Sequence, residues 1–148
     1  MQHFELRVIA EALTILDMHL KSKGDVFTSP MAVASFLRLH LEREESEVFA
    51  VMFLDAQHRL IEFRRMFFGT IDKTTIHPRE VVKAALQLNA SAVCFSHNHP
   101  SGDPSPSHAD RQITAHLKSA LELVDVRVLD HLVIGHGKYE SLANLGWI

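Results

Sequence analysis

His97-Asn98-His99-Pro100-Ser101-Gly102-Asp103-Pro104-Ser105-Pro106-Ser107-His108-Ala109-Asp110 follows directly on the apolar run of residues 91–96. Side chains two positions apart in a strand share a face, so a strand that continues through His97 and His99 presents both imidazoles on one side. Three prolines and a glycine then exclude regular structure until a helix begins at Ser107. Two histidines at a strand end and Asp110 at a helix start can therefore meet at one point.

Two neutral imidazoles and a carboxylate, with a fourth position left open, form the ligand set of a catalytic zinc site. The alternative is that these are ordinary loop histidines, since the chain has 11 histidines and a His-x-His pair alone is weak evidence. The added carboxylate, the rigid turn and the apolar strand favour the metal site. We therefore predict that Zn2+ is bound by His97, His99 and Asp110.

A zinc hydrolase also needs a carboxylate for proton transfer. Zinc lowers the pKa of its bound water to about 7, and attack on a carbonyl requires a group that takes the water proton and passes it on. Glu47 is the best candidate because it heads an apolar strand and would stand at the end of the sheet. The alternative, equally weighted, is that Glu47 is only the last residue of an acidic run. Glu80 is a weaker candidate, because an acidic residue in the first turn of a helix is better explained by its favourable interaction with the helix dipole.

Two further polar residues near this stretch have two interpretations each. Ser107 is an N-cap candidate that can form a capping box with Asp110, although Ser105-Pro106 competes for the cap. A capping hydroxyl accepts a hydrogen bond, so its own proton stays free to stabilise an oxyanion. His131 lies in a strand, where a structural role is favoured over a role in orienting a metal ligand.

Composition describes an ordinary globular protein. The 148 residues are 47% hydrophobic and 22% charged, which indicates one domain with a full core. There is no apolar run of membrane-spanning length and no signal-peptide pattern, and the single Cys94 cannot form an internal disulfide, so we expect a cytoplasmic protein. The net charge of −3 argues against a dedicated nucleic-acid surface, although Arg59, Arg64 and Arg65 cluster.

Apolar periodicity predicts an α/β fold. The expected helices cover residues 3–22, 29–41, 78–88 and 107–123, and the expected strands cover 48–54, 59–68, 91–96 with the two histidines at its end, and 126–134. Residues 55–58 are a predicted hairpin turn, and the tail 139–148 adds a last strand or turn. A helix between two strands implies a parallel pair and the hairpin an antiparallel one, so the sheet is expected to be mixed.

Several local details follow from the same patterns. Gly24 is the expected stop of the first helix, and Ser29 is the expected N-cap of the second. Met31 and Leu86 are placed on the buried sides of the second and third helices. The charge run of residues 42–47 is expected to be an exposed connector.

The pattern of His97-x-His99, seven residues, Ser107, two residues and Asp110 resembles the JAMM (MPN+) metalloprotease motif. The whole string 97–110 resembles the RadC family, as do Gly69-Thr70, residues 78–82 and Leu129-Asp130-His131. The resemblance covers roughly residues 28–148, the expected RadC-like JAMM/MPN domain. Residues 1–27 are expected to form an N-terminal helix that is part of the same unit.

The resemblance implies zinc ligands at His97, His99 and Asp110, a general acid/base at Glu47 and an oxyanion contact from Ser107. It also implies a JAMM fold, a curved mixed sheet flanked by helices with a layout related to cytidine deaminases. The implied activity is zinc-dependent hydrolysis of a peptide or isopeptide bond in an unidentified peptide or protein. Full-length RadC proteins carry an N-terminal helix-hairpin-helix region suited to DNA. This chain looks like the shorter RadC-like proteins of prophage and mobile elements.

Three other functions compete with hydrolysis. One is a DNA-repair-associated or DNA-processing factor, which the acidic net charge does not support. The string His-Asn-His is not the signature of HNH nucleases, whose residues are dispersed over a ββα motif. Another is a non-catalytic zinc-binding module. A nucleobase deaminase would need a Cys-x-x-Cys pair, which the single Cys94 excludes. The sequence predicts no oligomeric state.

Overall fold

The computed structural model describes residues 1–22, 30–70 and 74–148. It is a mixed α/β structure, as predicted. The elements in chain order are α1 (His3–Ser22), α2 (Pro30–Leu41), β1 (Val48–Leu54), β2 (Leu60–Phe68), α3 (Pro78–Gln87), β3 (Ala92–Asn98), α4 (His108–Glu122), β4 (Arg127–Ile134) and β5 (Tyr139–Ser141).

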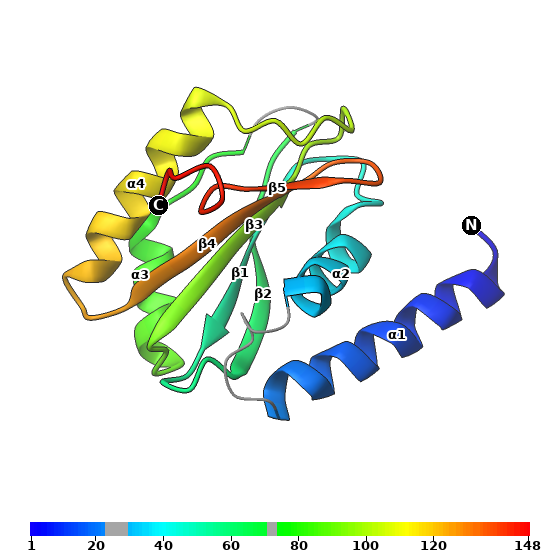
Figure 1. The fold of residues 1–148 in the computed structure, drawn as a ribbon, viewed down its shortest axis with the longest axis horizontal. Helices are drawn as coiled ribbons and strands as arrows, with labels where there is room; N and C mark the ends of the chain where they lie inside the picture. Colours follow the sequence, from blue (N-terminus) through cyan, green and yellow to red (C-terminus); the bar gives the residue numbers. More distant parts are fainter. Residues whose placement is uncertain (23–29, 71–73) are drawn as a thin grey trace.

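The strands form one open sheet in the order β2-β1-β3-β4-β5. Only β3 and β4, which flank α4, run parallel; the other three neighbouring pairs are antiparallel. Figure 1 shows α1 and α2 on one side of the sheet and α3 and α4 on the other. Each side has its own hydrophobic core, so the sheet is the middle of three layers.

The central strand β1 is apolar throughout because both of its faces are covered. All seven of its residues are buried. Phe49, Val51 and Phe53 pack toward α3 and α4, and the alternate residues pack toward α1 and α2. The same alternation in β3 sends His97 to the α4 side of the sheet and Asn98 to the α2 side.

Some local predictions about the helices were wrong. Met31 is 83% exposed because it lies in the first turn of α2, ahead of the buried positions. Leu86 is 55% exposed because it lies one residue, about 100° around the helix, from the buried Ala85. The predictions for Gly24 and Ser29 lie outside the described residues.

The arginines that cluster in the sequence are each paired with a carboxylate. Arg59 pairs with Asp55, Arg64 with Glu62, and Arg65 with Glu44. These arginines therefore do not form an uncompensated basic patch. In the described part of the chain, no helix combines the length and the apolar character needed to cross a bilayer.

Stability should fall on mild acidification through His40. The imidazole of His40 stacks on Phe63, with ring centroids 4.2 Å apart and an interplanar angle of 19°. Burial, together with the nearby Arg65, lowers the pKa of His40 to about 4. The unfolded chain takes up this proton at about pH 6.5, whereas the folded chain resists it until about pH 4. The contribution of His40 to stability is therefore complete above about pH 6.5 and is lost as the pH falls toward 4.

The variant His40→Phe keeps the aromatic contact and removes the titrating group. Its urea midpoint should drop less than that of the wild type between about pH 7 and about pH 5. Other titrating groups act equally in both proteins, so the difference between the two slopes isolates His40. Identical slopes would contradict the assignment.

Candidate metal centre

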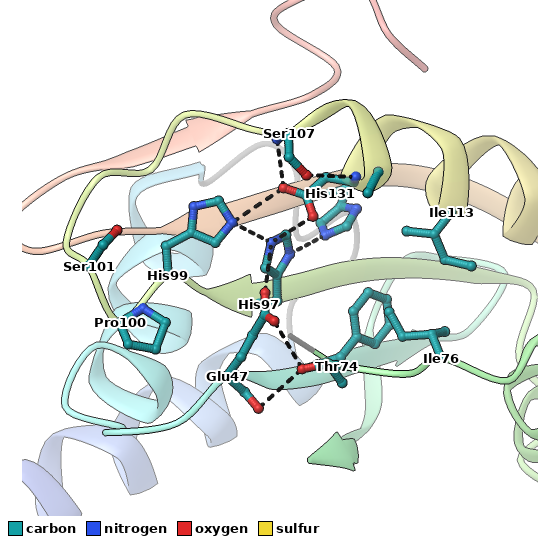
Figure 2. Close-up of a pocket in the computed structure, with 13 residues that line it drawn as sticks. Glu47, Thr74, Ile76, His97, His99, Pro100, Ser101, Ser107, Ile113 and His131 are labelled. Carbon is teal, nitrogen blue, oxygen red and sulfur yellow. Dashed lines mark hydrogen bonds and ion pairs between the residues drawn. The ribbon is translucent and has the colours of Figure 1, made fainter. Parts of the chain in front are cut away.

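Four side chains from three parts of the chain meet at one end of the sheet (Figure 2). Glu47, His97, His99 and Asp110 each place one ligand atom in a cluster that spans no more than 4.8 Å. The Nε2 atom of His97 lies 3.0 Å from Nε2 of His99 and 3.3 Å from Oδ1 of Asp110. The Nε2 atom of His99 lies 3.3 Å from Oδ2 of Asp110.

This donor set suits a tetrahedral metal ion. An ion about 2.0–2.1 Å from each ligand holds its ligand atoms about 3.3 Å apart, which matches the observed spacing. Imidazole lone pairs and carboxylate oxygens that face one another also repel unless a proton or a cation lies among them. Both the spacing and the chemistry of the cluster therefore fit a cation such as Zn2+.

Asp110 is held in place by the start of α4. Ser107 is the N-cap: its hydroxyl accepts a hydrogen bond from the Asp110 amide at 3.0 Å, and Oδ2 of Asp110 accepts one from the Ser107 amide at 2.8 Å. The predicted capping box is thus confirmed, and Ser105 is not the cap. Burial opposes ionisation of Asp110, but hydrogen bonds from His97 and His99 in their protonated forms hold the pKa of its carboxyl well below the usual range.

The turn between the strand and α4 fixes the tautomer of His99. Its Nδ1 lies 2.9 Å from the carbonyl oxygen of Asp103, which can only accept, so Nδ1 carries the proton. The Nε2 lone pair of neutral His99 therefore faces the cluster. Hydrogen bonding of the protonated ring to Asp110 raises the pKa of His99. Gly102, with φ of +91°, closes the turn against His136 where a Cβ would clash.

A chain of three hydrogen bonds fixes the tautomer of His97. The Thr114 hydroxyl donates its only proton to the carbonyl oxygen of Asp110 at 2.7 Å. The Thr114 oxygen, 2.6 Å from Nδ1 of His131, therefore accepts from that nitrogen. The Nε2 atom of His131 is then an acceptor for Nδ1–H of His97 at 2.7 Å, which leaves the Nε2 lone pair of His97 facing the cluster.

This chain of hydrogen bonds, which we call the Thr114–His131 relay, requires a neutral His131. The residue is fully buried, and burial lowers the pKa of His131 well below its ordinary value. The sequence left two interpretations of His131 open, a satisfied histidine of the sheet and a partner that orients a metal ligand; in the structure both ring nitrogens are hydrogen-bonded, one of them to His97. Figure 2 shows the ring directed at His97.

Glu47 belongs to the cluster and not to an exposed connector. It is 9% exposed, and its Oε1 lies 3.7 Å from Nε2 of His97. Its Oε2 accepts a hydrogen bond from the Thr74 hydroxyl at 3.1 Å. Its amide donates to the carbonyl of Thr70, and its carbonyl accepts from the amide of Gly69, so the pairing of β1 with β2 extends through Glu47. The expectation of a uniformly exposed run over residues 42–47 was wrong at this position.

Asn98, the middle residue of the His-Asn-His string, holds the backbone on both sides of Glu47. Its side chain is buried on the α2 side of the sheet. Its Oδ1 accepts from the Val48 amide at 2.8 Å, and its Nδ2 donates to the carbonyl of Ser46 at 3.0 Å. Asn98 thus couples the strand of the two histidines to the residue that approaches them from β1.

The family comparison agrees with this geometry. A family model described as "RadC-like JAB domain" matches residues 27–147. The chain belongs to the RadC family. The expected JAMM-like fold is confirmed by this match together with the mixed sheet and its flanking helices.

Its RadC relatives include proteins from several bacteria. A UPF0758 protein of Vibrio cholerae is 52% identical over 145 residues, which are 98% of this chain and 90% of the relative. UPF0758 protein XOO0462 of Xanthomonas oryzae is 50% identical over 143 residues, 95% of this chain and 64% of the relative. A UPF0758 protein of Cellvibrio japonicus is 56% identical over 125 residues, 84% of this chain and 56% of the relative. The chain thus spans less than two thirds of two of these three relatives.

Sequence reasoning missed two residues that organise this RadC site. Thr114 follows Asp110 by four positions, so it lies one helical turn further on the same face, and this spacing is visible in the sequence. Asn98 was passed over as a spacer between histidines. The sequence feature that could have identified Asn98 is its polar side chain at the end of a strand that is buried on both faces, because a buried polar group needs hydrogen-bond partners.

Proposed function

We propose that this protein is a zinc-dependent hydrolase that cleaves a peptide or isopeptide bond. The observation that carries the proposal is the buried Glu47 carboxylate 3.7 Å from Nε2 of His97, beside a set of three potential ligands. Two imidazoles and one carboxylate leave a coordination position open, which is typical of catalytic rather than structural zinc. A second carboxylate next to that position is what proton transfer in hydrolysis requires.

In this proposal His97, His99 and Asp110 would hold the zinc, which would lower the pKa of a water molecule and polarise the substrate carbonyl. Glu47 takes the proton from the attacking water and delivers it to the leaving amine. The Ser107 oxygen accepts a hydrogen bond from Asp110, so the hydroxyl proton is free to donate to the developing oxyanion. Cleavage of the C–N bond thus consumes one water and yields a carboxylate and an amine.

Metal removal tests the whole proposal. The zinc-loaded chain should cleave members of a mixed peptide and ubiquitin-like isopeptide library, with new N-termini detected by mass spectrometry. Stripping with a chelator should abolish these cleavages, and added zinc should restore them. A chain that binds zinc and cleaves nothing would favour the non-catalytic module. Failure to bind zinc would overturn the proposed metal centre itself.

The Thr114–His131 relay should matter for metal affinity. Thr114→Val removes the hydroxyl at nearly constant volume, so His131 loses the partner that fixes its tautomer. Zinc affinity should fall by about 10- to 100-fold, as is typical when a partner of a metal-bound histidine is removed. Thr114→Ser keeps the hydroxyl and is the matched control. Chelator competition measures the affinity, and equal affinities for the two variants would contradict the relay.

The DNA-associated alternative has no comparable support in the structure. The clustered arginines, the one basic feature noted in the sequence, are paired with carboxylates. Salt-dependent binding of duplex DNA by the purified chain would revive it.

A further inference from the structure

We propose that the substrate carries an apolar side chain next to the bond that is cleaved, and that Phe49, Ile76 and Ile113 bind it. We call these three residues the apolar wall. The inference rests on the proposed function and specifies the class of substrate. It comes from the cavity of about 460 Å³ whose lining includes both the metal-ligand cluster and the apolar wall.

The periodicity of the lining elements explains why the cavity has both polar and apolar side chains. Phe49 comes two residues after Glu47 in an extended chain, and Ile113 comes three residues after Asp110 in α4. Residues at these spacings share a face of a strand or of a helix. Ile76 likewise comes two residues after Thr74, which contacts Glu47. The segments of Glu47, Thr74 and Asp110 are therefore each continued, one step along, by an apolar side chain.

The wall is placed to receive a ligand rather than to fill the core alone. Phe49 is buried at the floor, with its ring centroid 6.3 Å from that of His97. Ile76 and Ile113 are only half-buried and pack on the core beneath them. Figure 2 shows both isoleucines on the same side of His97, Ile113 beside α4 and Ile76 on the segment of Thr74. A substrate side chain over them would remove their remaining apolar surface from water.

Charge supports the same ligand class. Among the described residues that line the cavity, the carboxylates are Glu47 and Asp110, and both lie in the metal-ligand cluster. The wall offers no group to pair with a charged substrate side chain, which would lose its hydration without compensation. An aliphatic or aromatic side chain has no such cost.

Hydroxamates test the wall without relying on turnover. Acetohydroxamate contacts a zinc ion with almost no side chain, whereas 4-methylpentanohydroxamate adds a leucine-like chain. Calorimetric titration of the zinc-loaded protein should show at least about 30-fold tighter binding of the larger compound, since each buried methylene is worth about fourfold in affinity. Ile113→Asn and Ile76→Asn should each reduce this preference to less than about tenfold while leaving acetohydroxamate affinity unchanged.

Leu86→Asn, on the exposed side of α3 and outside the cavity, is the matched control and should keep the full preference. Unchanged acetohydroxamate affinity also shows that each variant has folded. Equal binding of the two hydroxamates by the wild type would overturn the apolar wall and leave the proposed hydrolase standing. Failure of the zinc-loaded protein to bind acetohydroxamate would overturn the open metal site, and this inference with it.

Discussion

Glu47→Gln should leave zinc binding intact and lower turnover by at least about 100-fold, the usual contribution of a general acid/base. The amide has nearly the same shape as the carboxylate, and its oxygen can still accept the hydrogen bond from Thr74. It cannot accept a proton from water at neutral pH. Because the other three residues of the cluster are unchanged, the loss should appear in kcat rather than in metal content.

The measurement is turnover of a peptide found in the library screen, alongside zinc content by mass spectrometry. Glu80→Gln is the matched control, because Glu80 is an exposed carboxylate in the first turn of α3, outside the cluster. Wild-type turnover in the Glu47→Gln variant would remove Glu47 from the mechanism. Loss of zinc in the same variant would assign Glu47 to the metal rather than to proton transfer.

Asp110→Ala should lower zinc affinity by more than about 100-fold, because it removes the only anionic ligand of the proposed set. The same carboxylate also accepts the hydrogen bond from the Ser107 amide, so the variant loses part of its helix cap. Two further variants separate the effects. Asp110→Asn keeps a cap acceptor and loses the charge, whereas Ser107→Ala loses the cap and keeps the ligand.

Chelator competition on these variants gives the affinity, and thermal unfolding gives the stability. Asp110→Asn should lose zinc with nearly wild-type stability. Ser107→Ala should keep zinc but lose about 1 kcal/mol of stability, the typical value of an N-cap. Wild-type zinc affinity in Asp110→Asn would exclude Asp110 as a ligand.

The parts of this site that sequence predicted are those governed by local geometry. The two-residue spacing of His97 and His99 on a strand and the three-residue spacing of Ser107 and Asp110 at a helix start depend only on backbone periodicity and capping. The uniformly apolar run of β1 likewise indicated a strand covered on both faces. Each of these features is local in the chain, and each agrees with the structure, except that β3 ends at Asn98, one residue before His99.

The parts that sequence left open depend on how separate elements align. Glu47 had two equally weighted interpretations because nothing local states that β1 lies beside β3 with Phe49 opposite His97. The two interpretations of His131 also stayed open, because its contact with His97 follows from the parallel register of β3 and β4, which pairs His97 with Val133 and brings His131 in diagonally. Strand register is a tertiary property, set by cores on both faces of the sheet.

Asn98 has a consequence for how the proposed hydrolase could be regulated. The amide sits between two residues of the metal centre and clamps the backbone on either side of Glu47 with buried hydrogen bonds. Displacing the backbone at Glu47 from the cluster would leave these buried groups unsatisfied, at a cost of about 1–3 kcal/mol for each. In the proposed hydrolase, a switch that shifts the backbone at Glu47 is therefore disfavoured. Control through access to the cavity or through the supply of metal would leave this clamp intact.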